Sequence, residues 1–249
     1  MDNAPDAKPA WSEEHSRQFI DLGRVFTPSR QEIRNTLLDL IPAAIHEPFL
    51  AVELGVGEGW LCEAILERFP ASRVLGLDGS ATMLGLTAER LQRYAGRFEL
   101  QPFRLEERRW RTGFDSEVRC IVSSLVVHHL DGAGKRMLYR DLYNGLAAGG
   151  ALLLADVVAP TGDWERRHMA QSYDAIVQQQ SLSMTGSLDA YRQFVATNWN
   201  LFAHPDPMDM PSTVVEHLTW LADAGFTGVS VFWLHAGHAV YGGYKPSAV

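Results

Sequence analysis

Residues that could hold a cofactor are concentrated between positions 50 and 60 of this chain. Leu50–Leu54 is a short apolar run, typical of a buried parallel strand, and it carries Glu53 near its end. Glycines follow at every second position, at Gly55, Gly57 and Gly59. A loop without Cβ atoms can turn sharply and let the backbone approach a ligand closely. Because Trp60–Phe69 has apolar residues at helical spacing, the stretch predicts the strand, loop and helix of a nucleotide-binding α/β unit.

A second acid lies at the end of the next strand-like run, Arg73–Asp78. Asp78 follows the glycines by about twenty residues, where a carboxylate accepts hydrogen bonds from the ribose hydroxyls of an adenosine. The glycine spacing E-x-G-x-G-x-G differs from the G-x-G-x-x-G of a pyrophosphate-binding loop. An acid before the loop suits a cationic ligand better than a pyrophosphate. The pattern therefore favours an adenosine-containing cofactor other than a dinucleotide.

Further polar residues follow the fourth and fifth expected strands. The run 119–127 places Ser123 and Ser124 near a strand end and leads directly to His128 and His129. Asp156 ends the fifth expected strand, residues 151–157. Since the carboxyl ends of parallel strands meet at one edge of a sheet, these side chains are expected to border the ligand. His128, His129 and Asp156 are the candidate catalytic residues, as acid–base or acceptor-orienting groups, while structural packing of the histidines remains open. A metal site is not expected, because adjacent histidines point apart and no third ligand is near in the sequence.

These motifs, taken in order over residues 50–156, resemble the class I S-adenosylmethionine (SAM) dependent methyltransferases. The glycine loop is similar to the first motif of that family. The run from Ser123 to Leu130 is similar to its pattern S-x-x-x-x-H-H-L. Its pattern L-x-x-G-G-x-L-x-x-x-D is present as Leu146, Gly149, Gly150, Leu152 and Asp156. The set of motifs is more specific than any one of them.

The resemblance implies SAM as cofactor and S-adenosylhomocysteine (SAH) as product. It implies cofactor-binding roles for Arg30, Glu53, Gly55, Gly57, Asp78, Gly79, Met83, Leu105, Ser123 and Ser124. Asp78 is expected on the ribose and Met83 on the adenine, while Arg30 could meet a carboxylate. The chain departs from the family at Arg104, where an Asp near the adenine amino group is common. Arginine cannot accept a hydrogen bond, so backbone and Leu105, or alternatively Glu106, would hold the adenine.

The fold implied is α/β, a Rossmann-like seven-stranded, mostly parallel sheet with an antiparallel last strand and helices on both faces. We expect a single domain in four segments: a helical extension (1–45), a cofactor-binding core (46–157), a helical lid insert (158–213) and a C-terminal helix and hairpin (214–249). Ser29 and Ser212 are expected to cap helices. The insert is too long for a simple connection and is rich in aromatic and amide side chains. Tyr173, Arg192, Trp199 and His235 are the candidate substrate-binding residues.

Composition narrows the possible partners. The chain has 249 residues and a formal net charge of -8, with no lysine- or arginine-rich run. Arginines between positions 104 and 111 are interrupted by Glu106 and Glu107, so no nucleic-acid surface is expected. The two cysteines, Cys62 and Cys120, have no metal-type neighbours, and no apolar run approaches ~18 residues, so we expect a cytoplasmic protein without a membrane partner. The N-terminal residues do not form a signal-peptide pattern.

The function favoured is methyl transfer from SAM to a small-molecule acceptor by in-line displacement. A fainter resemblance, in the helical insert and the terminal hairpin, is to the carboxy-SAM synthases. An NAD(P)-dependent oxidoreductase is disfavoured by the glycine spacing and by the absence of an evident Tyr-x-x-x-Lys pair. A non-catalytic SAM-binding protein stays open, since intact cofactor residues do not require intact chemistry. The acceptor, the atom methylated and the oligomeric state are not indicated.

Overall fold

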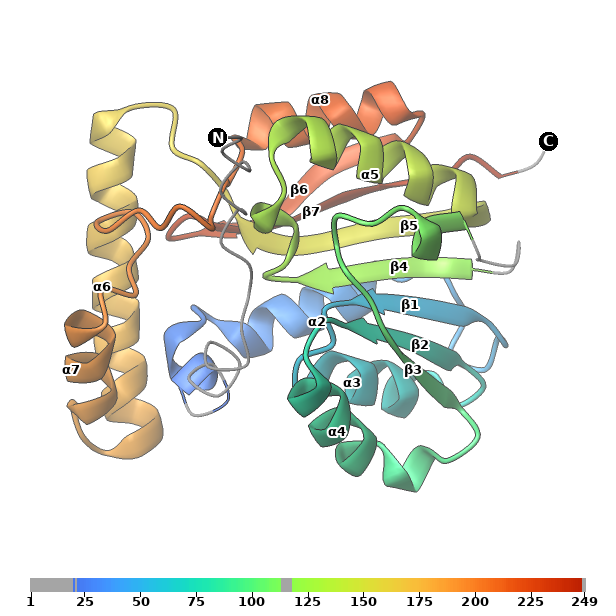
Figure 1. Ribbon diagram of the computed structural model, residues 1–249, viewed down its shortest axis with the longest axis horizontal. Helices are drawn as coiled ribbons and strands as arrows, with labels where there is room; N and C mark the ends of the chain where they lie inside the picture. The colour runs from blue at the N-terminus through green and yellow to red at the C-terminus, as the bar shows by residue number, and fades with distance from the viewer. Residues whose placement is uncertain (1–19, 21, 113–117, 248–249) are drawn as a thin grey trace, which may run out of the picture.

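A seven-stranded sheet forms the centre of the protein, with the strand order β3-β2-β1-β4-β5-β7-β6 (Figure 1). This computed structural model describes residues 20, 22–112 and 118–247. The strands are β1 (Leu50–Leu54), β2 (Arg73–Asp78), β3 (Phe98–Pro102), β4 (Val118–Ser124), β5 (Leu146–Val157), β6 (Thr227–His235) and β7 (His238–Tyr244). The pairs among β1 to β5 are parallel, whereas β7 runs antiparallel to both of its neighbours. The expected Rossmann-like sheet with an antiparallel last strand is confirmed.

Helices cover both faces of the sheet. They are α2 (Arg30–Leu40), α3 (Trp60–Arg68), α4 (Ala81–Arg90), α5 (Gly132–Gly145), α6 (Asp163–Thr185), α7 (Asp189–Ala196) and α8 (Val214–Ala224), with short 3₁₀ turns η1 (Gln92–Tyr94), η2 (Arg109–Thr112) and η3 (Val127–His129). Buried residues of α5 and α8 pack on one face, and those of α2 and α3 pack on the other. Successive residues of β1 alternate between these two cores, because side chains of a strand point alternately to opposite faces. The apolar run of β1 therefore reflects burial on both sides.

The insert between β5 and α8 contains α6, α7 and an irregular segment. Figure 1 shows α6 and α7 beyond the ends toward which β4 and β5 point. The rings of Phe194 and Trp199 each lie 5.2 Å from that of Phe26, so the insert packs on the segment before α2. Tyr173 of α6 lies 4.9 Å from His238 at the start of β7. The expected helical insert is thus present, and it stands at the carboxyl edge of the parallel strands. Among the described residues no helix combines the length and apolar character needed to cross a membrane.

Three local expectations are corrected by the structure. Ser29 is the N-cap of α2 but makes no side-chain cap hydrogen bond, because its backbone is left-handed (φ 49°) rather than extended. The N-cap of α8 is Thr213, in a capping box with Glu216, rather than Ser212. The fourth strand ends at Ser124, since Leu125 takes a left-handed conformation (φ 59°). The helix expected over residues 11–24 lies largely outside the described residues.

Candidate active site

The glycine loop is held against the end of β2 by backbone hydrogen bonds. The N–H groups of Gly55 and Val56 both donate to the carbonyl of Leu77, at 2.8 and 3.0 Å. The backbone at Gly55, Gly57 and Gly59 is left-handed, with φ of 71°, 53° and 76°. Such values are strained for residues with a Cβ, which explains the glycines. A Cβ at Gly57 would have no protein atom within 4 Å, so this turn faces open space.

Asp78 joins the loop to the following helix. Its Oδ2 accepts from the N–H of Gly57 at 2.9 Å, and its Oδ1 accepts from the N–H of Ser80 at 2.9 Å. Ser80 caps α4 by accepting a hydrogen bond from the N–H of Met83 at 3.1 Å. A carboxylate oxygen can accept more than one hydrogen bond. Gly79 turns between these two residues, and Met83 is buried beneath them.

Glu53 is buried below the loop. The thiol of Cys62 donates to its Oε2 at 2.7 Å, and only 1% of the residue is exposed. Burial, with a smaller contribution from the charge of Asp78, raises the pKa of Glu53 to about 8. At neutral pH Glu53 therefore keeps its proton, and the negative charge of Asp78 favours that neutral form. A ligand with a positive group near this loop would be attracted by Asp78.

Arg30 lies at the mouth of the same loop. Its guanidinium stacks over the ring of Trp60, 4.4 Å from the centroid, and lies 3.7 Å from Oε2 of Glu58. Burial lowers the pKa of Arg30 to about 10. Trp60, the first residue of α3, was not singled out in the sequence, although its position directly after the glycines was the available signal. The structure therefore brings Arg30 next to the glycine loop.

The adenine-side residues are fixed by other parts of the chain. The indole of Trp110 donates to the carbonyl of Arg104 at 2.8 Å, and Arg111 donates to the carbonyl of Leu105 at 2.6 Å. Leu105 is buried. Ser123 is also buried, and its hydroxyl donates to the carbonyl of Leu54, which links β4 to β1. Ser124, at the end of β4, is only partly buried.

His128 is held from two sides by Asp156, at the carboxyl end of β5. Nδ1 of His128 lies 2.5 Å from Oδ1 of Asp156, and the N–H of His128 donates to Oδ2 at 3.0 Å. Burial lowers the pKa of His128, but the charge of Asp156, its hydrogen bond and the charge of Asp209 outweigh burial and raise the pKa above its usual value. For Asp156, burial raises the pKa. The charge and the hydrogen bond of His128 have a larger effect, so the pKa of Asp156 lies below its usual value. The pair fixes the orientation of the ring.

Asp209, in the insert, lies close to both His128 and His129. Its Oδ1 lies 3.4 Å from Nε2 of His128 and 3.4 Å from Nδ1 of His129. The two rings, expected to point apart, have centroids 4.1 Å apart. That expectation was wrong because both residues lie in the tight turn η3 rather than in an extended strand. Asp209 was missed because it is about eighty residues away in sequence, within a proline-rich loop.

A buried lysine positions that loop. Lys135 of α5 is fully buried, donates to Oγ of Ser212 at 2.9 Å, and also donates to the carbonyl of Met210. Burial lowers the pKa of Lys135 to about 8. The N–H of Met210 donates to the carbonyl of His128 at 2.8 Å. In the sequence, Lys135 lies at an apolar position of the helix that forms α5, which could have indicated a buried, hydrogen-bonded lysine.

The four candidate substrate residues have different surroundings. Tyr173 is buried, with Phe194 and His238 packed edge-on against its ring. Trp199 is half-buried, and its ring packs on Phe26. The structure does not bring Arg192 to the site: it pairs with Asp189 one turn earlier on α7, and its side chain is 73% exposed. His235 is also exposed, because it ends the edge strand β6. His238, rather than His235, is the buried histidine beside Tyr173.

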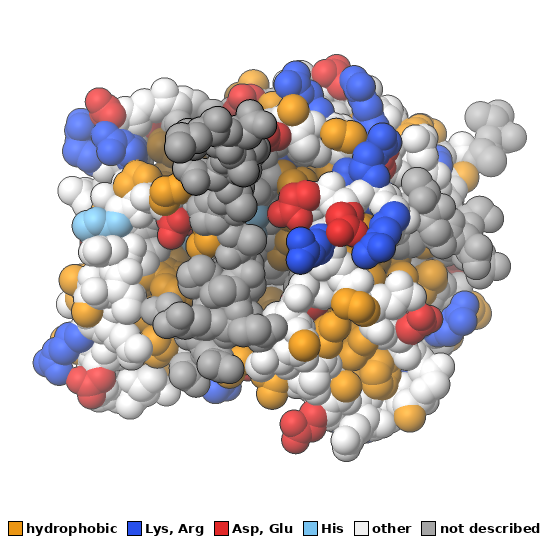
Figure 2. Space-filling view, viewed as in Figure 1, with side chains coloured by type: hydrophobic (Ala, Val, Ile, Leu, Met, Phe, Trp, Pro, Cys, Tyr) orange, Lys and Arg blue, Asp and Glu red, His pale blue; other side chains and the backbone are white. Residues whose placement is uncertain are grey.

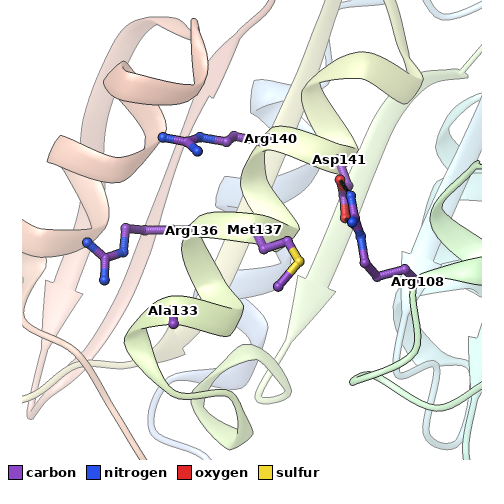
Figure 3. A pocket seen from close by; sticks show the side chains of 6 residues that line it. All are labelled: Arg108, Ala133, Arg136, Met137, Arg140 and Asp141. Atoms are coloured by element: carbon purple, nitrogen blue, oxygen red, sulfur yellow. Dashed lines mark hydrogen bonds and ion pairs between the residues drawn. The ribbon is translucent and has the colours of Figure 1, made fainter.

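A separate cavity of about 460 Å³ lies on the outer side of α5 (Figure 3). Its lining residues are Arg108, Ala133, Arg136, Met137, Arg140 and Asp141. Arg108 pairs with Asp141 at 2.6 Å, while Arg136 and Arg140 point away from that pair. Figure 2 shows acidic and basic side chains interspersed on this face. The arginines therefore do not converge on one ligand.

The matches to known proteins agree with this geometry. Residues 51–150 match a family model described as "Methyltransferase domain". Residues 51–150 form a methyltransferase domain. The match includes the glycine loop, Asp78 and both histidines, and it ends at Gly150 inside β5.

Two relatives match different lengths of this chain. The chain is 29% identical over 150 residues to trans-aconitate 2-methyltransferase of Streptomyces avermitilis, covering 59% of the chain and 51% of that protein. It is 38% identical over 76 residues to ribosomal RNA small subunit methyltransferase H of Kocuria rhizophila, covering 28% of the chain and 23% of that protein. The chain thus spans about half or less of the length of these relatives.

A solved structure shows how far the fold is shared. An O-methyltransferase family protein from Burkholderia thailandensis superposes with a TM-score of 0.67 at 17% identity, over 96% of this chain and 61% of that one. At this identity the likeness shows the fold alone. It extends beyond the methyltransferase domain, because it includes the insert and the terminal hairpin.

Proposed function

We propose that this chain transfers the methyl group of SAM to a small-molecule acceptor and releases SAH. The observation that carries the proposal is the meeting of two groups of residues at the carboxyl edge of the sheet. Asp78 and the glycine loop form one group, and His128 with Asp156 forms the other. The groups touch where Gly55 packs on Val126, two residues before His128. A cofactor on the first group would place its methyl beside the second.

The residues of the first group fit SAM. Gly57 leaves open space at the loop, and the carboxylate oxygens of Asp78 are acceptors suited to ribose hydroxyls. Arg30 at the mouth suits the carboxylate of the methionine part, and the carboxylate of Asp78 suits a ligand with positive charge. A pyrophosphate would instead meet this carboxylate, which is unfavourable. The donor set therefore supports SAM over a dinucleotide.

The main catalytic task of the protein would be to position the reactants. The sulfonium of SAM already activates the methyl group, so the nucleophile must be brought in line and water excluded. His128, fixed by Asp156, and the adjacent His129 present their rings where an acceptor's nucleophilic atom would lie. The similarity to trans-aconitate 2-methyltransferase supports a small organic acceptor, and we propose an oxygen nucleophile. The insert, with Tyr173 and Trp199, would close over this acceptor as a lid.

Partners and location follow from the same proposal. A small acceptor needs no basic surface, which agrees with the net charge of -8 and with the interspersed charges of Figure 2. Arg108 and Arg111 both pair with Asp141, so part of the arginine cluster is neutralised within the chain. The two cysteines are free and buried, which supports a cytoplasmic setting.

Mass spectrometry of small molecules released from the purified chain, with calorimetric titrations of SAM and NAD(H), tests the proposal. Co-purified SAM or SAH, or SAM binding without NAD(H) binding, is expected. Binding of NAD(H) but not of SAM would overturn the cofactor assignment. Release of a carboxylated SAM would replace methyl transfer by the chemistry of the carboxy-SAM synthases. Once SAM binding is shown, small hydroxy and carboxylic acids are the first acceptors to screen.

A further inference from the structure

Three side chains from two distant parts of the chain converge beside the proposed acceptor position. His128 and His129 lie in η3, and Asp209 lies in the loop before α8. One ligand atom from each, an imidazole nitrogen or a carboxylate oxygen, lies within 4.8 Å of the others. Oδ1 of Asp209 is 3.4 Å from Nε2 of His128 and 3.4 Å from Nδ1 of His129.

The hydrogen bond between His128 and Asp156 has a consequence for the other side of the ring. Asp156 is a carboxylate 2.5 Å from Nδ1, so the ring proton belongs on Nδ1. A neutral ring then presents the lone pair of Nε2 to the carboxylate of Asp209. Two hydrogen-bond acceptors that face each other repel. A proton or a metal cation between them removes the repulsion. Nδ1 of His129 faces the same carboxylate and, at 3.3 Å, the carbonyl of Met208.

We propose that His128, His129 and Asp209 bind one divalent transition-metal ion, with Zn²⁺ as the best fit to two imidazoles and one carboxylate. Zinc lies about 2.0–2.2 Å from nitrogen and oxygen ligands, and tetrahedral bonds of this length separate neighbouring ligand atoms by roughly 3.3–3.5 Å. Both 3.4 Å distances lie in that range. Asp156 would be the carboxylate behind the ligating histidine, which fixes its tautomer and orientation.

The loop that carries Asp209 is held in place independently of any ion. The N–H of Met210 donates to the carbonyl of His128 at 2.8 Å. Lys135, fully buried, donates to the carbonyl of Met210 and to Oγ of Ser212. The site is therefore assembled by the fold, so that binding does not have to order the loop.

Three protein ligands leave one position of a tetrahedral ion open. The acceptor-binding part of the inference rests on the proposed function: an acceptor oxygen would take this position. Its O–H proton would pass to water. A lone pair of the oxygen would then form the new O–CH₃ bond, while the electron pair of the S–CH₃ bond returns to the sulfur of SAH. Metal binding itself does not depend on that function.

Zinc titration of the chelator-treated full chain by calorimetry, with Co²⁺ as a spectroscopic substitute, tests the site. We expect one Zn²⁺ per chain and a visible Co²⁺ absorption typical of four-coordination. Asp209→Asn should weaken zinc binding at least tenfold, and Asp156→Asn should weaken it by about 10- to 100-fold. His46→Asn removes an exposed histidine outside the site and should leave zinc binding unchanged.

Absence of stoichiometric zinc binding, or equal zinc binding by wild type and Asp209→Asn, would overturn the inference and leave a proton between His128 and Asp209. SAH titrations of the same metal-free samples separate the two proposals. Bound SAH without bound zinc would reject the metal site alone. Bound zinc without bound SAH would reject the proposed methyl transfer alone. Circular dichroism of each variant shows that its fold is retained.

Discussion

Gly55 and Val126 come from different strand ends, yet a Cβ added to Gly55 would lie 2.2 Å from Cγ2 of Val126. Gly55 belongs to the loop after β1, and Val126 directly precedes η3, which carries both histidines. The loop and the histidine turn are therefore packed without space for one methyl group. This contact sets the position of the proposed cofactor relative to His128.

Alanine at Gly55 and at Gly57 should have different consequences. Both positions have positive φ, so each substitution should cost about 1–2 kcal/mol of stability. Gly55→Ala should cost more, because of the contact with Val126. Gly57→Ala meets no protein atom within 4 Å, so its added effect should appear in SAH affinity instead. Urea unfolding and calorimetry measure the two effects.

Gly85→Ala is the matched control for both variants. Gly85 lies inside α4, and a Cβ there meets nothing within 4 Å. It should stabilise the protein by up to about 1 kcal/mol, the helix-propensity difference, without changing SAH affinity. Equal SAH affinity for Gly57→Ala and Gly85→Ala would contradict the loop's assignment to the cofactor.

Asp78→Ala should weaken SAH binding by roughly 1–3 kcal/mol, because charged hydrogen bonds to the ribose are lost. The variant also removes the acceptor for the N–H groups of Gly57 and Ser80, so its melting temperature should fall as well. The exposed Asp223 provides the control, Asp223→Ala. An unchanged SAH affinity of Asp78→Ala in calorimetry would contradict the assignment of Asp78 to the ribose.

Glu53 should make stability fall as pH rises. Its pKa is raised to about 8 in the folded chain, whereas an ordinary glutamate has about 4.5, so the folded state keeps a proton that the unfolded state loses. The contribution is present in full below about pH 4.5 and is lost as pH rises through about 8. Glu53→Gln removes this dependence.

Between pH 4.5 and 8, the unfolding free energy of wild type should fall relative to that of Glu53→Gln. The difference should change by up to about 1.4 kcal/mol for each pH unit. Chemical unfolding at several pH values measures it. Glu89→Gln changes the same charge at an exposed site of α4 and is the control. Parallel pH profiles for Glu53→Gln and wild type would refute the assignment of a raised pKa.

Lys135→Met should leave the carbonyl of Met210 and the hydroxyl of Ser212 without this donor. The expected loss of stability is about 1–3 kcal/mol. Since these bonds hold the loop with Asp209, cleavage in this loop by a protease should also become faster. Arg136→Met, at the neighbouring exposed position, should change neither quantity. Loss of stability without faster cleavage of the loop would argue against a positioning role.

Binding of SAH should slow proteolysis within residues 158–213 if the insert closes over the site. The protection should be lost in Asp78→Ala at SAH concentrations that saturate the wild type only. Time courses of limited proteolysis, with fragments identified by mass spectrometry, measure it. Equal rates with and without SAH would count against a lid.

Much of the cofactor half was readable from the sequence, because it depends on contacts between neighbouring elements. A strand, a tight glycine turn and a helix are local, and the acid at the end of the next strand is placed by the right-handed crossover between parallel strands. Glu53, Gly57 and Asp78 therefore lie where the spacing predicted.

The acceptor half was decided by the tertiary structure. Asp209 reaches His128 and His129 only because Lys135 and the backbone of Met210 pin a loop of no regular structure. Tertiary contacts also account for the failed caps. Ser29 has a left-handed backbone where its N–H donates to Gln180. The hydroxyl of Ser212 instead accepts from Lys135. Local spacing fixes which elements form, but contacts between residues far apart in the chain determine where irregular segments place their side chains.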